Sequence, residues 1–353
     1  MVDPKIITHP HGDLTFTSTL YYGADVRESL KTLPDQSVQC VVTSPPYFKL
    51  RSYLGEGDPL KGSEIGSEPT LEEYVNSMVD VFREVRRVLR DDGVLWCNLG
   101  DSYAGGGVFS PNSPSNLAGS KQTTQRGAIS GGLKPQGEIK PKDLVGIPWM
   151  VAFALRADGW YLRSDVIWAK ENPMPEPVTD RPTRSHEYVF LLTKSSRYFY
   201  DADAIREPIK ESNTGKIATL AKDAGTVLDA TGKPLRVERA YTEIKGANRR
   251  SVWTINPKPY RGAHFATMPP ALAEVCVKAG SRSGDTVLDP FSGSGTTGYV
   301  ANRLGRHYVG TDLNLDYLPL AEARLTGMDP PETDDATPSE EGGPSSILDL
   351  LGG

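Results

Sequence analysis

The sequence predicts an α/β protein with a doubly wound, mostly parallel sheet, and two observations carry this prediction. Short apolar runs typical of buried strands, such as residues 38–42 and 94–99, alternate with stretches in which apolar residues recur every three or four positions, as on one face of a helix. In addition, residues 287–298 pass from an apolar run through a glycine-rich turn into a helical pattern, and such junctions bind ligands in open α/β sheets.

Strands and helices alternate along the chain. Residues 38–42 are expected to form a buried strand that ends in Thr43-Ser-Pro-Pro-Tyr47. Apolar side chains recur at helical spacing over residues 71–89, Asp91-Asp-Gly93 ends this helix, and residues 94–99 form the next strand. The same patterns predict further helices near 144–158, 270–279 and 297–304, and further strands at 160–169, 188–192, 286–289 and 307–311.

Three segments lack this patterning. Residues 105–137 are rich in Gly, Ser, Pro, Asn and Gln and are expected to form a mobile loop, because they have little apolar surface to offset the entropy of ordering. Residues 194–262 contain 14 Lys or Arg against 8 Asp or Glu, so residues 200–262 are predicted to be a recognition insert in which Arg249 and Arg250 contact nucleic acid. Residues 327–353 are expected to be a disordered tail with seven acidic residues and no basic ones.

Charge and composition narrow the class of protein. The formal net charge of the 353 residues is −6, but without the acidic tail 39 basic residues face 38 acidic ones, so a nucleic-acid partner is compatible with the rest of the chain. Cys40, Cys97 and Cys276 are far apart, lack metal-ligand spacing and are expected to be buried thiols, so no metal is predicted. The N-terminus has no secretory pattern and no apolar run is long enough for a membrane span, which predicts a cytoplasmic protein without a membrane partner.

A ligand-binding signature lies in Val287-Leu-Asp-Pro-Phe-Ser-Gly-Ser-Gly-Thr-Thr-Gly298. Its glycines allow a ligand to approach the backbone, and about twenty residues later Asp312 ends the next strand at a position suited to ribose hydroxyls. A plain tight turn is one alternative. A dinucleotide site is another, because Gly293, Gly295 and Gly298 also satisfy the Gly-x-Gly-x-x-Gly spacing.

A second signature, Thr43-Ser-Pro-Pro-Tyr47, follows a buried strand at the sheet edge where α/β folds bind ligands. Two prolines fix the backbone and donate no hydrogen bond, so Ser44 Oγ and the Pro45 carbonyl are available to accept both hydrogens of an amino group. Tyr47 is suited to stack on a base flipped out of a duplex. Taken alone, this stretch is equally compatible with an ordinary Pro-Pro turn.

Together, Ser-Pro-Pro-Tyr and Asp-Pro-Phe-x-Gly-x-Gly resemble the motifs of β-class amino-group DNA methyltransferases of the restriction-modification type. The catalytic motif comes first and the cofactor motif last, as in that class, and the resemblance covers about residues 20–326. It implies a sheet of the S-adenosylmethionine-dependent methyltransferase type with a catalytic half at 20–199, a target-recognition insert at 200–262 and a cofactor-binding half at 263–326. It also implies double-stranded DNA as substrate and a cognate restriction endonuclease as a candidate partner, while the oligomeric state stays open.

The resemblance assigns roles to individual residues. The implied catalytic residues are Ser44, Pro45, Pro46 and Tyr47. The implied S-adenosylmethionine-binding residues are Asp25, Thr43, Thr267, Asp289, Pro290, Phe291, Ser292, Gly293, Ser294, Gly295, Thr296, Thr297 and Asp312. Thr267 belongs to His264-Phe-Ala-Thr-Met-Pro-Pro270, which departs from the family's motif at Phe265 and Met268.

Three of the implied residues also have a structural alternative. Asp25, which the resemblance places near the cofactor adenine, is equally suited to cap a helix. Asp101 is implied to border the base pocket, at the end of the strand beside the catalytic one. Trp168, in Trp168-Ala-Lys-Glu-Asn-Pro-Met-Pro175, is implied to form a pocket wall but is as well suited to the hydrophobic core.

Several functions compete with amino-group methylation of DNA. A cytosine-C5 enzyme needs a cysteine nucleophile after the Pro-Pro pair, where this chain has Tyr47. Related RNA and protein-glutamine methyltransferases usually have Asn before Pro-Pro and the opposite motif order. A non-catalytic DNA-binding protein would leave both signatures without a role. Within the family, Ser44 before Pro-Pro favours cytosine N4 as the target, because adenine-N6 enzymes commonly have Asp or Asn there, and adenine N6 is the alternative.

Overall fold

The computed structural model describes residues 3–11, 14–105, 137–173, 175–208, 227–228, 234–235, 246–257 and 268–327. Apart from Gly105, Gly137 and Gly327, the predicted mobile loop and the acidic tail lie outside the described residues, as does Thr267.

The sheet has nine strands in the order β1-β2-β11-β10-β3-β4-β6-β5-β9. The five strands from β2 to β4 are mutually parallel, whereas β1 and β6 run antiparallel to their neighbours. The mostly parallel α/β sheet predicted from the sequence is therefore confirmed. The strands are β1 (Lys5–His11), β2 (Leu14–Tyr22), β3 (Val38–Thr43), β4 (Leu89–Leu99), β5 (Tyr161–Ala169), β6 (His186–Thr193), β9 (Val252–Thr254), β10 (Thr286–Asp289) and β11 (His307–Asp312), with a separate pair β7 (Val227–Leu228) and β8 (Pro234–Leu235).

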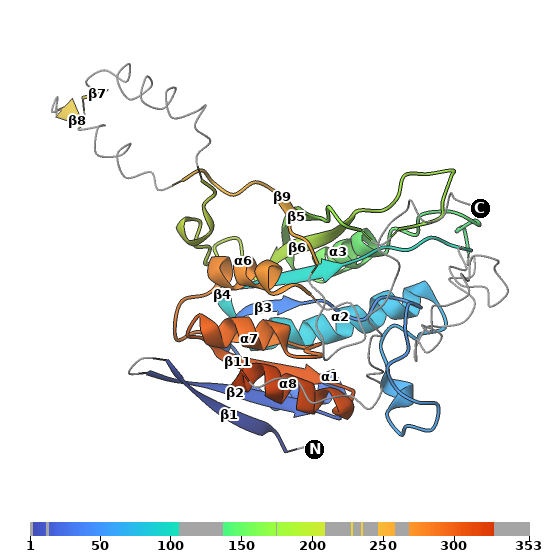
Figure 1. Ribbon diagram of the computed structural model, residues 1–353, viewed down its shortest axis with the longest axis horizontal. Coiled ribbons are helices and arrows are strands. Elements are labelled where there is room, and N and C mark those ends of the chain that lie inside the picture. The colour runs from blue at the N-terminus through green and yellow to red at the C-terminus, as the bar shows by residue number, and fades with distance from the viewer. Residues whose placement is uncertain are drawn as a thin grey trace, which may run out of the picture.

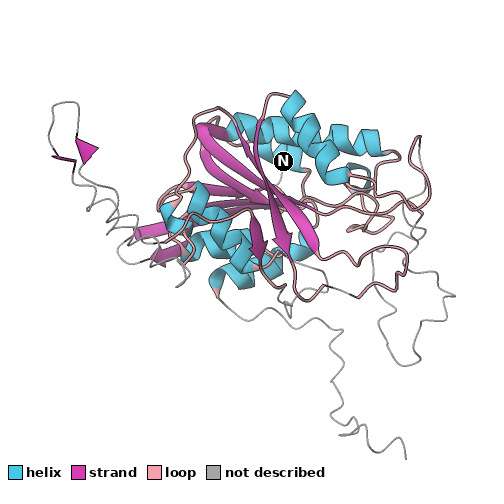
Figure 2. Ribbon diagram, turned by 90° about the horizontal axis from the view of Figure 1, so that it is seen from above, coloured by secondary structure: helices cyan, strands magenta, loops and turns pink. Residues whose placement is uncertain are grey.

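Helices cover both faces of the sheet (Figures 1 and 2). One face carries α1 (Val26–Lys31), α2 (Leu71–Val88) and α3 (Ile147–Ala157), and the other carries α6 (Pro270–Gly280), α7 (Thr296–Arg303) and α8 (Leu318–Thr326). The described residues also form the short 3-10 helices η1 (Lys61–Ser63), η2 (Asp203–Ile205) and η3 (Leu315–Tyr317). Each face has its own hydrophobic core, because alternate residues of the central strands point to opposite sides.

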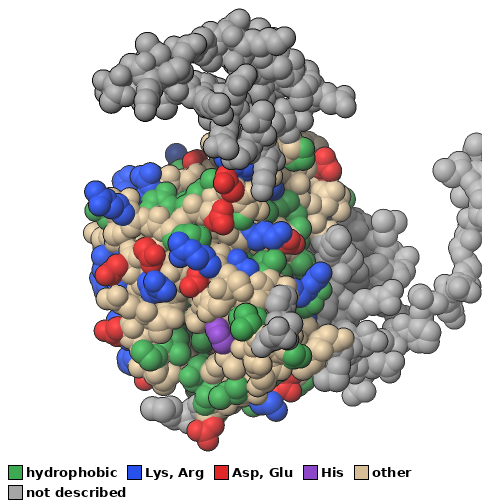
Figure 3. Space-filling model, turned by 90° about the vertical axis from the view of Figure 1, so that its left-hand side faces the viewer, with side chains coloured by type: hydrophobic (Ala, Val, Ile, Leu, Met, Phe, Trp, Pro, Cys, Tyr) green, Lys and Arg blue, Asp and Glu red, His purple; other side chains and the backbone are tan. Residues whose placement is uncertain are grey.

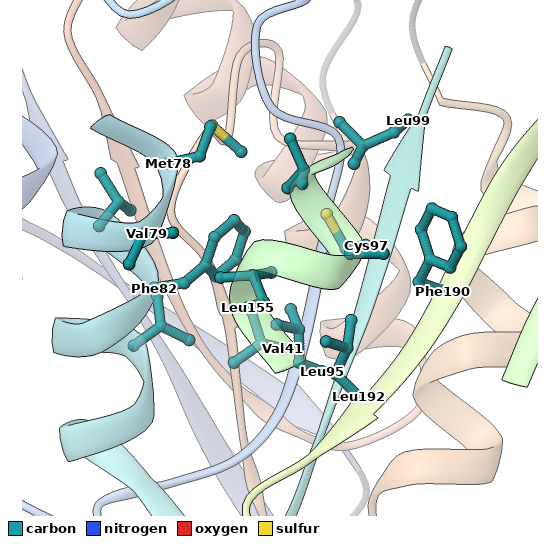
Figure 4. Close-up of a cluster of buried hydrophobic side chains, with 14 of the residues drawn as sticks. Val41, Met78, Val79, Phe82, Leu95, Cys97, Leu99, Leu155, Phe190 and Leu192 are labelled. Carbon is teal, nitrogen blue, oxygen red and sulfur yellow. The ribbon is translucent and has the colours of Figure 1, made fainter. Parts of the chain in front are cut away.

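Helix α2 shows how the sequence specifies one of these layers. Thr70 and Glu73 form a capping box, in which the Thr70 hydroxyl accepts a bond from the Glu73 N–H at 3.2 Å and the Glu73 carboxylate accepts one from the Thr70 N–H at 3.1 Å. The apolar stripe of α2 then packs on β3, β4 and β6, where Met78 and Phe82 face Leu95 and its neighbours (Figure 4). Burial of this stripe fixes α2, and with it the loop that leads away from β3.

The order of the strands does not follow the order of the chain. Strands β10 and β11, from the end of the chain, lie between β2 and β3 from its beginning. The predicted catalytic half and cofactor-binding half therefore share one sheet. The carboxyl ends of β3, β4, β10 and β11 meet at one edge, toward which the arrow of β4 points in Figure 1.

Several boundaries differ from the sequence-based expectation. The sheet starts with the hairpin β1–β2, ahead of residue 20. These two strands were not predicted from the sequence, because polar residues alternate with apolar ones in them and no continuous apolar run marks them. Residues 200–262 are not wholly an insert, because β9 extends the main sheet along β5 and Ile205 is buried in the core beside α6. The described flanks Glu207 and Ala247 exchange two backbone hydrogen bonds.

Glu207 and Ala247 lie far from the carboxyl edge of the sheet. The Phe199 N–H donates to the Asp92 carbonyl and the Asp201 N–H to the Ala279 carbonyl, so residues 199–201 lie where β3 and β4 begin. That side of the molecule faces the viewer in Figure 3, and its described surface has basic and acidic side chains intermingled.

Candidate active site

The loop between β10 and α7 presents backbone rather than side chains. Gly293 has φ of 51° and Gly295 has φ of 76°, a left-handed conformation that favours glycine. A Cβ atom added to Gly293 would meet no atom within 4 Å, whereas one on Gly295 would lie 3.2 Å from Ala321 Cβ of α8. Gly293 therefore faces open space and Gly295 allows close packing of two helices.

The side chains of this loop are held by the protein itself. Ser292 Oγ accepts a hydrogen bond from Tyr22 Oη at 2.7 Å and lies 2.8 Å from Tyr308 Oη. Ser294 Oγ accepts one from the Arg324 guanidinium at 3.0 Å. Of the predicted cofactor residues in the loop, Pro290, Ser292, Ser294, Thr296 and Thr297 are buried and Phe291 packs partly against the core. The surface that a ligand would meet here is mainly backbone.

Asp289 joins the two signatures of the sequence. One carboxylate oxygen accepts from Thr43 Oγ1 at 2.7 Å and the other from Thr297 Oγ1 at 2.8 Å, while the Phe291 N–H donates at 3.1 Å. Burial raises the pKa of Asp289 to about 6 despite these donors. Asp289 thus fastens the end of β3 to the start of α7, and its role as a direct cofactor ligand stays a prediction.

Asp312 ends β11 beside the same loop. Its oxygens accept from the Gly293 N–H at 2.7 Å and from the Asn314 N–H at 2.9 Å. Loss of hydration raises its pKa to about 7, and these two backbone donors lower it only in part. Each carboxylate oxygen can accept a second hydrogen bond, so Asp312 retains capacity for hydroxyl groups of a ligand.

The catalytic turn predicted at Ser44–Tyr47 follows β3 at the carboxyl edge. Tyr74 of α2 donates to the Pro46 carbonyl at 2.9 Å, and the Tyr47 carbonyl accepts from the Leu50 N–H at 3.2 Å. Among the described residues, none donates to the Pro45 carbonyl. The Pro45 carbonyl therefore stays available as an acceptor.

Tyr47 is fixed at both ends of its ring. A Cβ atom on Gly100 would lie 2.5 Å from Tyr47 Cε2, so the residue after β4 must be glycine for the ring to take this position. The Tyr47 hydroxyl donates to Glu187 at 2.6 Å, and burial raises its pKa, which keeps the phenol protonated. Asn98 of β4 completes the group, with its amide nitrogen 3.2 Å from Ser44 Oγ and 3.1 Å from Tyr47 Oη.

Glu187 is held by an ion pair that the sequence signatures did not indicate. It follows His186 at the start of β6, and because β6 is antiparallel to β4 this end lies at the carboxyl edge. Lys170, directly after β5, contacts its carboxylate, and Asn98 donates to it at 2.9 Å. Burial would raise the pKa of Glu187, but Lys170 and the neighbouring donors hold it below its usual value.

The remaining predicted residues have structural partners. Asp25 caps α1 and binds Arg27 at 2.6 Å, and the N–H groups of Gly146 and Ile147, at the start of α3, donate to Asp101 at 2.9 and 3.0 Å. Trp168 is a core residue whose indole N–H donates to the Ile255 carbonyl at 2.7 Å, with Lys170 Nζ 4.2 Å from its ring centre. Roles for these residues beside adenine or the target base stay predictions.

The two arginines of the recognition prediction lie just before β9. Arg249 packs over the Trp253 ring at 5.2 Å, and Arg250, whose side chain is 70% exposed, pairs with Glu207 at 2.8 Å. They are thus part of the packed domain rather than of a projecting insert, and a DNA contact by either stays a prediction.

Three side chains of the site escaped the sequence reasoning. Asn98 and Lys170 stand in stretches that drew attention for Asp101 and Trp168, whereas Glu187 lies outside every motif. The sequence marks Glu187 only as a charged residue at the start of an apolar strand. Polar residues are common at such positions, so this pattern could not identify it as part of the site.

The described parts of the chain show neither a metal site nor a membrane-spanning helix. No group of three or more His, Cys, Asp or Glu side chains is placed to hold a metal ion there. No helix there is both long and apolar enough to cross a bilayer.

Known proteins with similar sequences include type II methyltransferases of bacteria. A family described as DNA methylase, covering N6 and N4 enzymes, matches residues 38–323. The type II methyltransferase M.SmaI of Serratia marcescens is 45% identical over 85% of this chain and 88% of its own length. The type II methyltransferase M.Cfr9I of Citrobacter freundii is 44% identical over 88% of this chain and 89% of its own.

Solved structures give the same fold. TTHA0409 of Thermus thermophilus, complexed with S-adenosyl-L-methionine, aligns with a TM-score of 0.50 and 25% identity over 88% of this chain and 94% of its own. The PvuII DNA methyltransferase, described as cytosine-N4-specific, aligns with a TM-score of 0.55 and 18% identity over 87% of this chain and 86% of its own.

Proposed function

This chain belongs to the DNA methylase family of N6 and N4 enzymes, and from that premise we propose that it methylates the N4 amino group of cytosine in duplex DNA. It is an S-adenosylmethionine-dependent methyltransferase of DNA amino groups, of the type II restriction-modification kind. The choice of cytosine N4 goes further and rests on Ser44 before the Pro-Pro pair.

The residues at the carboxyl edge fit the cofactor. The open space outside Gly293 admits a ligand to the loop backbone, and Asp312 has acceptor capacity for ribose hydroxyls. When bound, S-adenosylmethionine supplies a methyl group on a positively charged sulfur atom. Gly293 and Asp312 would hold it, with Asp289 keeping their loop attached to the catalytic turn.

The catalytic turn positions the amino group of the target base. Because Tyr74 already occupies the Pro46 carbonyl, the Pro45 carbonyl and Ser44 Oγ are the acceptors for the two amino hydrogens. Accepting both hydrogens draws the nitrogen toward a tetrahedral form, whose lone pair can attack a methyl group in line. The Tyr47 ring, fixed by Gly100 and Glu187, provides a surface on which a flipped base can stack.

The identity of the methylated base can be measured directly. Purified protein would be incubated with radiolabelled S-adenosylmethionine and mixed-sequence duplex DNA, which is then digested to nucleosides and separated. We expect the label in N4-methyl-2′-deoxycytidine. Label found only in N6-methyl-2′-deoxyadenosine would exclude the cytosine proposal and leave amino-group methylation in place.

A further inference from the structure

Five side chains form a connected polar group behind the catalytic turn, which we name the Glu187 cluster. Its members come from β4, from β6, from the end of β5 and from the turn itself: Ser44, Tyr47, Asn98, Lys170 and Glu187. Only Ser44 and Tyr47 belong to the catalytic motif. The cluster lies on the side of the turn away from Asp289 and Asp312, since β6 and β5 lie beyond β4 in the sheet.

The carboxylate of Glu187 determines the direction of the bonds around it. Its side chain is 17% exposed and pairs with Lys170, whose side chain is 19% exposed. A carboxylate can only accept hydrogen bonds. Tyr47 must therefore donate its hydroxyl proton to Glu187, and Asn98 must turn its NH2 group, not its carbonyl, toward the carboxylate.

The orientation of the Asn98 amide has a consequence for Ser44. Glu187 Oε2 and Tyr47 Oη are 2.6 Å apart, so one amide hydrogen of Asn98 can be shared between them, and the second hydrogen is left for Ser44 Oγ at 3.2 Å. Asn98 Oδ1 points the other way and has no hydrogen-bond partner among the described residues. A buried orphan acceptor is costly, which indicates that the nitrogen side of the amide is needed where it is.

We propose that Glu187 is a positioning residue for methyl transfer, which holds the Tyr47 ring and, through Asn98, fixes the direction in which the Ser44 hydroxyl can hydrogen-bond. With Asn98 donating to it, Ser44 Oγ keeps one lone pair and its own proton for the target base. These match a base edge on which an amino group adjoins a ring nitrogen. The inference rests on transfer at the Ser44–Tyr47 turn and holds for cytosine or adenine.

The first test replaces Glu187 by glutamine, which keeps the size of the side chain but adds an N–H donor. Tyr47 and Asn98 are then no longer both compelled to donate to it. In single-turnover methyl transfer to mixed-sequence duplex DNA, we expect the rate of Glu187→Gln to fall roughly 10- to 100-fold. The Kd for S-adenosylmethionine should stay at the wild-type value, because Asp289 and Asp312 lie across β3 and β4. The Tm should fall, because Lys170 loses the partner of its ion pair.

Glu84→Gln is the matched control. Glu84 is also partly buried, at 27% exposure, and pairs with Arg87 at 2.9 Å, but it lies in the last turns of α2, where the helix packs beside Asp35 and Leu33. We expect wild-type transfer from this variant. A fall equal to that of Glu187→Gln would indicate a general effect of losing an ion pair and would overturn the proposal.

A second test uses the pH profile, which a purely structural role would not change. Among the described residues, the charged and titratable groups around Glu187 are Lys170 directly after β5, Tyr47 from the turn, His186 at the start of β6 and Arg184 just before it. Lys170→Met removes the cation that opposes the effect of burial, so Glu187 becomes protonated at a higher pH. At saturating S-adenosylmethionine, we expect the transfer rate of Lys170→Met to begin falling at a higher pH than that of the wild type as the pH is lowered, and the double variant with Glu187→Gln to lack this shift.

The outcomes separate this inference from the proposed site itself. If Ser44→Ala transfers methyl groups at the wild-type rate, the catalytic turn has been misassigned. If Ser44→Ala is impaired but Glu187→Gln is not, only the positioning role fails. Should Glu187→Gln not fold, the pH profile of Lys170→Met decides, and a profile identical to that of the wild type would overturn the proposal.

Discussion

Asp289 and Asp312 end two adjacent parallel strands, yet their environments suit them to different tasks. Asp289 is enclosed by two threonine hydroxyls and a backbone N–H, and its carboxylate has become part of the internal framework. Asp312 accepts hydrogen bonds from the backbone N–H groups of Gly293 and Asn314 and is partly exposed. Of the two, Asp312 is the one that a ligand can reach.

The raised pKa of Asp312 predicts a pH-dependent cofactor affinity. Ribose hydroxyls donate to the carboxylate, so binding favours the charged form. Because the pKa of the Asp312 carboxyl is about 7 without the cofactor, lowering the pH below 7 protonates Asp312 and should weaken S-adenosylmethionine binding. The weakening should reach at most about tenfold per pH unit, with a plateau above pH 7.

Calorimetric titration between pH 5.5 and 8.5 measures this dependence. Asp312→Asn is the control, since it cannot titrate, and it should bind more weakly than wild type at high pH with a flat profile. A wild-type profile parallel to that of Asp312→Asn would show that this carboxylate is not the ribose acceptor.

Gly293→Asp should abolish cofactor binding while the fold survives. The new side chain would enter the open space outside the loop and place a second carboxylate beside Asp312. The left-handed backbone at φ 51° adds strain of about 1 to 2 kcal/mol, which aspartate tolerates better than most residues.

Gly284→Asp provides the comparison, because Gly284 is also left-handed, at φ 87°, and also faces open space, but it precedes β10 at the opposite edge. We expect both variants to lose similar amounts of Tm and only Gly293→Asp to lose S-adenosylmethionine affinity in calorimetry. Equal affinities would remove Gly293 from the cofactor site.

At the level of helices and strands, the close packing of α7 on β11 requires a glycine, which has no side chain, at position 298. A Cβ atom on Gly298 of α7 would lie 2.5 Å from the Tyr308 ring, and Tyr308 also bonds Ser292 in the cofactor loop. Alanine normally favours a helix over glycine, but here overpacking reverses the sign. We expect Gly298→Ala to lower the free energy of unfolding by about 1 to 3 kcal/mol.

Chemical denaturation gives that free energy. Gly57→Ala, at a loop position with nothing within 4 Å, should change it far less. A Gly298→Ala variant as stable as wild type would mean that α7 can move away from Tyr308 without loss of packing.

Sequence patterns predicted the helices, the strands and the two motifs better than they predicted which distant residues come into contact in the folded protein. The helix at Pro270–Gly280 and the strand at Thr286–Asp289 lie almost where the apolar spacing placed them, because burial on one face dictates that spacing. The order of strands has no local signal, so the hydrogen bond of Thr43 to Asp289 was not predicted, although the family resemblance placed both residues at the cofactor site. Glu187 could not be predicted at all, since its partners come from β4, β5 and the Ser44–Tyr47 turn, which converge only after folding.

At the scale of the whole molecule, the folded domain should not need its acidic tail. Helix α8 ends at Thr326 with Gly327 as a left-handed C-cap, and its last buried residue is Leu325. We expect a chain ending at Gly327 to keep the wild-type Tm and the single-turnover transfer rate. A chain ending at Tyr317, which lacks α8, should melt earlier because Gly295 loses its contact with Ala321; equal destabilisation of both truncations would show that the tail is docked.

The electrostatics of DNA binding give a prediction for Arg249 and Arg250. If they contact phosphates, replacing both with alanine should weaken DNA binding and flatten its salt dependence by roughly 0.9 per lost contact on a log–log plot. The exposed Arg250 should account for the change in slope, whereas Arg249→Ala should mainly lower the Tm, because Arg249 covers Trp253.

Filter binding over a range of salt concentrations measures the slope. Arg83→Ala is the control, since Arg83 is also exposed, at 58%, and pairs with Asp158 on the α2–α3 face. A slope in Arg250→Ala that equals the slope in Arg83→Ala would place the DNA contacts on other residues.

The position of β10 and β11 between β2 and β3 affects how the protein is made in the cell. A nascent chain that has emerged only as far as residue 285 possesses the catalytic turn but lacks the two strands that separate β2 from β3. Its edges of β2 and β3 then expose unpaired backbone groups, which are open to wrong pairing until β10 and β11 leave the ribosome. Premature termination there leaves an incomplete sheet rather than a slower enzyme, so methylation begins only after both of these strands have been translated.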